Sequence, residues 1–90
     1  MSRTIFKYEL FHSDVQNIPM PFRSQILCVK QQNISTFLWV LQDNDLPTDD
    51  VSIFTFGTGD ILPDDIALTY IDTVIYNFGE VYHYFRSNVN

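Results

Sequence analysis

The stretch that decides the fold is residues 23–42, RSQILCVKQQNISTFLWVLQ. Two apolar runs in it are joined across residues 32–35, and the second run carries the only tryptophan of the chain, Trp39. Two such runs on either side of a short turn predict a β-hairpin. The second arm, 37–41, is apolar on both faces. This indicates a strand that is central in a two-layer packing or is covered by a partner chain.

Shorter predicted strands flank this hairpin. Alternating apolar and polar positions predict a strand over 4–11, and a short edge strand over 15–18 should end at Pro19 and Pro21, which cannot donate ladder hydrogen bonds. Further strands are predicted at 51–56, 68–76 and 81–85, and each is bounded by turn residues. Asp64 allows one short helical turn, although a plain loop serves equally. Six to seven short strands predict an all-β fold, a small antiparallel β-barrel or sandwich.

The composition agrees with this class and limits the function. Residues 1–90 are enough for a single domain with one modest core. Aromatic residues make up 16% of the chain and alanine occurs once, which favours strands over helices. The net charge of -6 disfavours direct binding to nucleic-acid phosphates. No apolar run is long enough for a membrane helix and the lone Cys28 cannot form an internal disulfide, so we expect a soluble cytoplasmic protein without membrane contact.

The sequence predicts no catalytic set, metal or cofactor. Cys28 lies between apolar neighbours, where nothing would activate its thiol. The acidic loops at 43–50 and 60–65 do not fit the helix-loop-helix calcium pattern and stand at opposite ends of one strand. Two histidines and one cysteine without a close-spaced pair do not predict a zinc site. We therefore expect a protein that is not an enzyme.

The last third of the chain holds the candidate binding residues. Residues 57–59, Gly-Thr-Gly, could present backbone N–H groups to a ligand, or they could simply form a turn or bulge. If Ile71, Ile75, Val81 and Phe85 line the core, strand alternation places four tyrosines together on the opposite face, as an exposed wall suited to an interface or as a wetter face of the sheet. The candidate ligand- or partner-binding residues are Gly57, Thr58, Gly59, Tyr70, Tyr76, Tyr82, His83 and Tyr84.

Several motifs resemble a family of small phage and prophage proteins. The motifs are IFKYEL (5–10), ILCV (26–29), LW (38–39), FGTG (56–59), YIDT (70–73) and VYHYF (81–85). Members of that family carry a His after Gly-Thr-Gly where this chain has Asp60, so no role of that His is transferred here. The resemblance implies a small β domain with an accessory role in the host cell cytoplasm, and it implies no reaction.

The functional expectation follows from these points. We expect a non-enzymatic phage-type accessory protein that inhibits a host defence component through protein–protein contact. One alternative is a sponge that sequesters a small cyclic signalling nucleotide between residues 57–59 and the aromatic residues of the closing strands. Another is a phage structural or morphogenesis part. The arm that is apolar on both faces and the tyrosine wall also lead us to expect a homo-oligomer.

Overall fold

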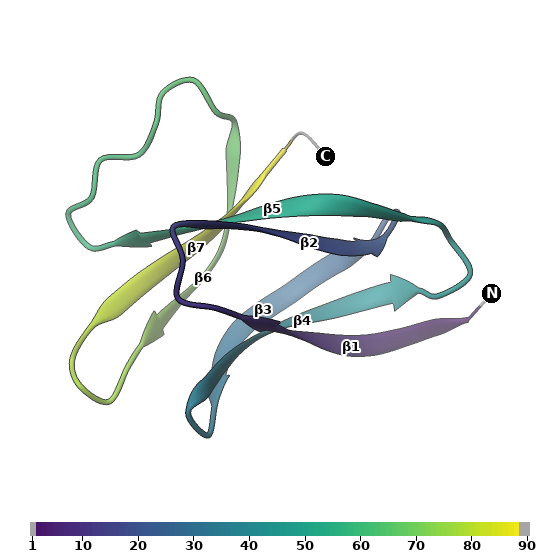
Figure 1. The fold of residues 1–90 in the computed structure, drawn as a ribbon, viewed down its shortest axis with the longest axis horizontal. Coiled ribbons are helices and arrows are strands. Elements are labelled where there is room, and N and C mark those ends of the chain that lie inside the picture. The colour runs from purple at the N-terminus through teal and green to yellow at the C-terminus, as the bar shows by residue number, and fades with distance from the viewer. Residues whose placement is uncertain (1, 89–90) are drawn as a thin grey trace.

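The computed structural model describes residues 2–88, which form seven strands and no helix (Figure 1). The all-β class is therefore confirmed, and the stretch around Asp64 is a plain loop. Since the described residues contain no helix, none of them forms a helical membrane span. The strands are β1 (Arg3–Leu10), β2 (Val15–Pro21), β3 (Gln25–Gln32), β4 (Ser35–Asp43), β5 (Thr48–Gly57), β6 (Leu68–Ile75) and β7 (Val81–Ser87).

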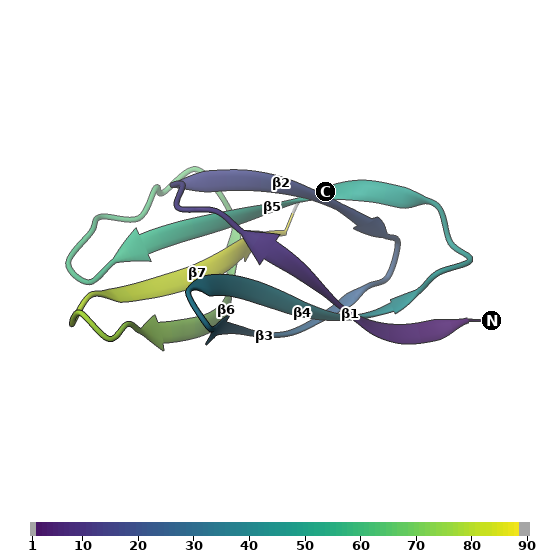
Figure 2. The same ribbon diagram turned by 60° about the horizontal axis from the view of Figure 1, so that its bottom comes forward.

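The strands make two antiparallel sheets. Sheet A has the order β1-β4-β3, and sheet B has the order β2-β5-β7-β6. Figure 2 shows sheet B descending from β2 and β5 to β6, which lies beside β3 of sheet A. The opposite edges, β1 and β2, pair only within their own sheets. The architecture is a two-layered sandwich whose layers approach at the β3 and β6 edges.

The predicted hairpin is present as β3 and β4. Its turn contains Asn33 with a φ of 58°, a left-handed conformation that asparagine tolerates better than most residues. β4 is the central strand of sheet A, and its inward side chains Leu38 and Val40 are fully buried. The packing between the layers accounts for the inner apolar face of this arm, whereas its outward side chains Phe37, Trp39 and Leu41 stay partly exposed. On the outer face Trp39 stands opposite Cys28, and both side chains are partly exposed.

β2 and β5 extend by several residues beyond their predicted bounds. β2 continues through Pro19 and Pro21, because an edge strand tolerates proline where the missing N–H would point away from the sheet. β5 begins at Thr48, so Asp49 and Asp50 belong to a paired strand instead of the first acidic loop. Both corrections extend sheet B.

Side chains from both sheets form one hydrophobic core between the layers. Met20, which follows the first proline of β2, is only 1% exposed and belongs to it. The core also contains two of the tyrosines that were candidates for an exposed surface. Its members are Leu10, Ile18, Met20, Val29, Leu38, Val40, Val51, Ile53, Val74, Tyr76 and Tyr84.

Candidate functional site

The four C-terminal tyrosines do not form one exposed wall. Tyr84 is 5% exposed and Tyr76 is 9% exposed, whereas Tyr70 is 55% exposed on the outer face of sheet B. A bulge between Tyr70 and Asp72 breaks the alternation of β6, so Tyr70 and Tyr76 lie on opposite faces of the sheet. The prediction that the four tyrosines lie together on one exposed face is therefore wrong. The face that was expected to be core, carrying His83 and Phe85, is the outer one.

A chain of hydrogen bonds on this outer face is centred on His83. Its Nε2 lies 2.8 Å from Thr58 Oγ1, and its Nδ1 lies 3.0 Å from Thr73 Oγ1. Thr73 Oγ1 lies 2.7 Å from the Tyr70 hydroxyl. These four side chains, called the His83 chain below, come from three separate segments of the sequence. They hold the imidazole ring in a fixed orientation above sheet B.

Aromatic rings continue the outer face beside the His83 chain. Phe54 lies opposite Val15 in β2 and opposite Phe85 in β7, and Phe85 in turn lies opposite Tyr70 in β6. One row of apolar side chains therefore crosses all four strands. Phe56 adds ring contacts to this row, with its centroid 5.7 Å from that of Phe85. We call Val15, Phe54, Phe56, Tyr70 and Phe85 the aromatic face.

The glycine pair of residues 57–59 forms a turn at the end of β5. Asp60 N donates to Gly57 O at 3.1 Å, and Gly57 N donates to Asp60 Oδ2 at 2.7 Å. Gly59 has a φ of +94°, which explains a glycine at this position. The shallow hollow of about 540 Å³ beside this turn is lined by Asp60 and Glu80 but by no Lys or Arg. The Asp60 carboxylate thus already accepts a hydrogen bond from the N–H of Gly57, one of the groups that a ligand would need.

Tyr76 and Tyr82 meet in a cleft of about 290 Å³ at one end of the sandwich, and Tyr82 also lines the hollow beside residues 57–59. Their ring centroids lie 5.7 Å apart, and Phe78 stacks on Tyr76 at 5.6 Å. His12 contacts Tyr82 edge-on at 5.5 Å. The Tyr82 hydroxyl donates to the Glu80 carboxylate, and this hydrogen bond raises the pKa of Tyr82. The predicted site residues therefore do not share one site: Thr58, Tyr70 and His83 lie on the outer face of sheet B, Tyr76 and Tyr84 line this cleft, and Tyr82 borders both the cleft and the turn of residues 57–59.

A family model described as "Domain of unknown function (DUF7352)" matches residues 1–90, the full length of the chain. The chain belongs to the DUF7352 family. No curated protein and no solved structure matches it.

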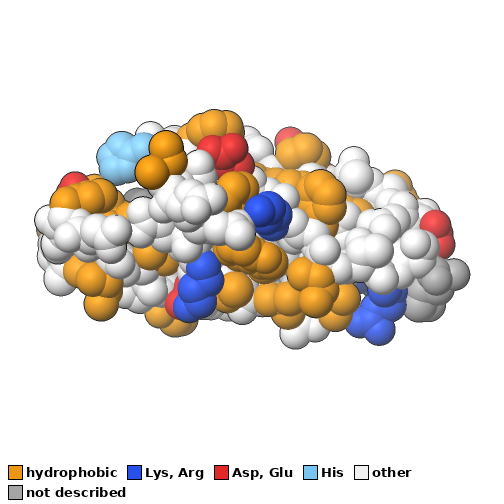
Figure 3. All heavy atoms as spheres, turned by 90° about the horizontal axis from the view of Figure 1, so that it is seen from below, with side chains coloured by type: hydrophobic (Ala, Val, Ile, Leu, Met, Phe, Trp, Pro, Cys, Tyr) orange, Lys and Arg blue, Asp and Glu red, His pale blue; other side chains and the backbone are white. Residues whose placement is uncertain are grey.

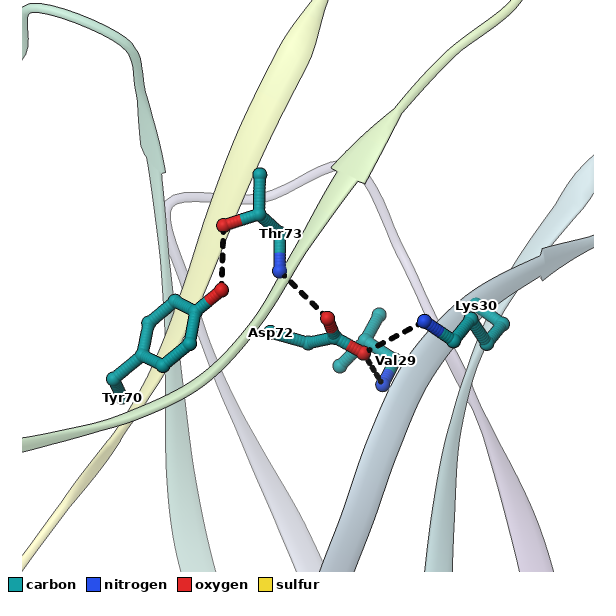
Figure 4. Close-up of polar contacts among 5 residues, drawn as sticks. All are labelled: Val29, Lys30, Tyr70, Asp72 and Thr73. Atoms are coloured by element: carbon teal, nitrogen blue, oxygen red, sulfur yellow. Dashed lines mark hydrogen bonds and ion pairs between the residues drawn. The ribbon is translucent and has the colours of Figure 1, made fainter.

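In this DUF7352 domain, Asp72 connects the outer-face site to the other sheet (Figure 4). Its Oδ1 accepts the N–H of Thr73, and its Oδ2 accepts the N–H of Val29 in β3 at 3.0 Å. Lys30 Nζ stands 3.3 Å from the same Oδ2. Burial raises the pKa of Asp72, but the two backbone hydrogen bonds and Lys30 together outweigh it and lower the pKa below its usual range. The carboxylate therefore joins the edge of sheet B to the edge of sheet A.

Sequence reasoning missed Thr73 and Asp72, although both lie in the YIDT motif. Thr73 reaches His83 because the two residues are register partners, and Asp72 turns inward because of the bulge. Neither fact can be read from a pattern of alternation. Within residues 2–88, no three His, Cys, Asp or Glu side chains are grouped as the ligands of a metal would be.

The buried tyrosines of the domain form a second polar network. The Tyr84 hydroxyl lies 2.8 Å from that of Tyr76, which lies 2.7 Å from Thr36 Oγ1 in β4. This network crosses from sheet B to sheet A inside the core. Burial, followed by the hydrogen bond with Tyr76, raises the pKa of Tyr84 far above its ordinary value. Tyr84 is therefore held neutral in the folded state.

The raised pKa of Tyr84 predicts a loss of stability in alkali. The unfolded chain ionises this hydroxyl near its ordinary pKa of about 10, while the folded chain does not, so the free energy of unfolding should fall as the pH rises above about 10. Tyr84→Phe should cost about 1 kcal/mol at pH 7 and make this fall less steep. Urea unfolding between pH 8 and pH 11 measures both effects. Tyr70→Phe is the matched control, and an equal change of slope in both variants would contradict the assignment.

Proposed function

We propose that this DUF7352 protein is a non-enzymatic, phage-type accessory protein that inhibits a host defence component by binding it through the aromatic face. The observation that supports this proposal is the row of apolar side chains across all four strands of sheet B. Neither Tyr70, at 55% exposure, nor Val15, at 48%, is covered by another layer. Exposed aromatic patches of this kind favour protein partners. The phage and host-defence parts of the proposal derive from the resemblance of the motifs.

The electrostatics favour a protein partner over a nucleotide. A cyclic nucleotide would bring negative phosphate to the hollow beside residues 57–59, where Asp60 and Glu80 carry like charge. The net charge of -6 adds a further unfavourable field. An apolar protein surface meets no such repulsion at the aromatic face, which is composed of uncharged side chains.

The His83 chain supports binding more than catalysis. Both ring nitrogens of His83 are hydrogen-bonded to threonine hydroxyls. In a catalytic triad, a buried carboxylate orients the histidine and stabilises its charged form. Here the position of that carboxylate is taken by the neutral Thr73. The chain therefore fixes the ring as part of a contact surface.

The proposal predicts that a charge placed on the aromatic face abolishes partner capture. Tagged wild-type protein would be used as bait in a host lysate beside Tyr70→Glu and the matched control Ile34→Glu. Ile34 is 96% exposed in the β3–β4 turn and lies outside the aromatic face, so this control adds the same charge at another surface. We expect Tyr70→Glu to reduce the captured protein by roughly tenfold or more, because an unpaired charge would be desolvated in the interface. Ile34→Glu should capture as the wild type does, and circular dichroism checks that both variants fold.

Other outcomes would replace the proposal. Equal capture by the wild type and Tyr70→Glu would exclude the aromatic face as the contact surface. Nucleotide released on denaturing the purified protein, or a thermal shift with cyclic nucleotides, would indicate the sponge. Recovery of the protein in purified virions would indicate a structural or morphogenesis part.

A further inference from the structure

The two sheets have outer edges of very different character. Strand edges expose unpaired N–H and C=O groups, and proteins commonly block them with proline or charge. At the edge of sheet B, β2 carries Pro19 and Pro21. At the edge of sheet A, β1 runs for eight residues without proline or glycine. Within residues 2–88, β1 pairs with β4 alone, so its other side is an open edge of sheet A (Figure 1).

The register identifies which backbone groups of β1 point outward. Asn44 N donates to Ser2 O at 2.7 Å, in line with the pairing of β1 and β4. Hydrogen-bonded pairs alternate along an antiparallel ladder, so the even-numbered residues of β1 bond to β4. Arg3, Ile5, Lys7 and Glu9 therefore direct their N–H and C=O groups to the open edge.

The side chains along this edge are exposed and partly apolar. Ile5 is 63% exposed and Phe6 is 50% exposed. Figure 3 looks from below onto the side where β1 lies in Figure 1, and hydrophobic side chains are interspersed there with basic ones. Arg3 stands near the start of the strand and Glu9 near its end. The strand therefore carries a basic residue at its start and an acidic residue near its end, with Lys7 between them beside the exposed Ile5 and Phe6.

We propose that β1 pairs antiparallel with β1 of a second copy of this chain, around a two-fold axis at Phe6. In this register Arg3 lies opposite Glu9 of the second copy, and Ile5 lies opposite its Lys7. The two Phe6 rings meet across the axis. All four outward-facing residues gain hydrogen-bonded partners, and the two A sheets become one continuous sheet. The interface is isologous, as expected for a two-fold dimer.

The neighbouring registers fit less well. If the two-fold axis moves by one residue to Lys7, the Lys7 side chains of the two copies face each other. Such a like-charge pair destabilises an antiparallel sheet. A further shift pairs Lys7 with Glu9 but sets Ile5 opposite Phe11. The backbone N–H and C=O of Phe11 are already bonded to the side-chain amide of Gln16, at 3.0 and 2.9 Å. Arg3 would have no strand partner in that register. The register centred on Phe6 is the one that uses the whole strand.

Charge reversal at two positions of β1 tests the pairing. Arg3→Glu and Lys7→Glu change the net charge equally, but in the proposed register only Arg3→Glu creates a like-charge pair, with Glu9. Because this pair occurs twice per dimer, we expect Arg3→Glu to weaken dimerisation roughly tenfold in sedimentation equilibrium. Lys7→Glu should change the dissociation constant by less than about threefold. The double variant Arg3→Glu/Glu9→Arg should restore the wild-type constant.

Amide hydrogen exchange provides a readout that a folding defect would not imitate. The amides of Ile5 and Lys7 should exchange more slowly in the wild type at high than at low protein concentration, and this dependence should weaken in Arg3→Glu. A wild type that stays monomeric would overturn the proposal. So would dissociation by Lys7→Glu and not by Arg3→Glu. The dimer does not depend on the proposed function, because β1 belongs to sheet A and the aromatic face to sheet B. Tyr70→Glu should therefore leave the dissociation constant of the dimer unchanged.

Discussion

Replacing Leu38 with alanine is expected to lower the free energy of unfolding by about 3 kcal/mol, within the range measured for fully buried leucines. Leu38 is 0% exposed in the middle of β4, the central strand of sheet A. Its register partners are Tyr8 in β1 and Val29 in β3, so the truncated side chain leaves a cavity that neither neighbour can fill without moving a strand. Urea unfolding followed by circular dichroism measures the loss.

Leu27→Ala is the matched control for this cavity. Leu27 is 42% exposed at the bulge of β3, so the same change in side-chain volume should cost less than about 1 kcal/mol. A similar loss in the two variants would show that the core is not centred on Leu38. A smaller slope with urea concentration in Leu38→Ala would instead mean a change in the surface exposed on unfolding.

Replacing Asp72 with alanine should cost about 2 kcal/mol at pH 7, because it removes charge-assisted hydrogen bonds between the edges of the two sheets. The N–H of Val29 and the ammonium group of Lys30 would both lose their contact with this carboxylate. Asp65→Ala removes the same charge from an exposed loop position and should change stability by less than about 0.5 kcal/mol. Chemical unfolding of both variants at pH 7 makes the comparison.

The pH dependence of Asp72→Ala separates this role from simple packing. The folded state lowers the pKa of Asp72, so its contribution is present above the ordinary carboxyl pKa of about 4 and is lost as the pH falls through the lowered value. The difference in unfolding free energy between the wild type and Asp72→Ala should therefore shrink below about pH 4. If the difference stayed constant down to pH 2, the effect of the substitution would not come from the ionised carboxylate.

The sequence was sufficient to predict the strands but not the direction of their faces. The hairpin at 23–42 and the closing strands follow from short apolar runs bounded by turn residues, and such signals are local. The inward face of β7 could not be predicted, because Tyr84 and Phe85 are both large and aromatic. Tyr84 became the core residue because the hydroxyl of Tyr76 satisfies its own hydroxyl there. That contact links residues from different strands and has no local signature.

Bulges explain most of the remaining differences between the predicted and the observed directions of the side chains. In β6 the bulge beside Ile71 sends Tyr70 outward and Asp72 inward, and in β3 another sets Leu27 out of register. Each extra residue reverses the alternation of everything that follows it on the strand. Thr58, Tyr70 and His83 were predicted as site residues and do meet. The prediction could not include Thr73, which completes their hydrogen bonding, because it depends on the register after the bulge.

Because Cys28 and Trp39 face each other in sheet A, they provide an optical probe of that sheet and not of sheet B. The chain has a single tryptophan and a single cysteine, and both belong to the three-stranded layer. Four of the five tyrosines lie in the last third of the chain. Indole emission, with the thiol as an attachment point for a quencher, therefore reports on that layer alone. Near-ultraviolet tyrosine signals report mainly on the other half, so native residues suffice to show whether the two halves melt together.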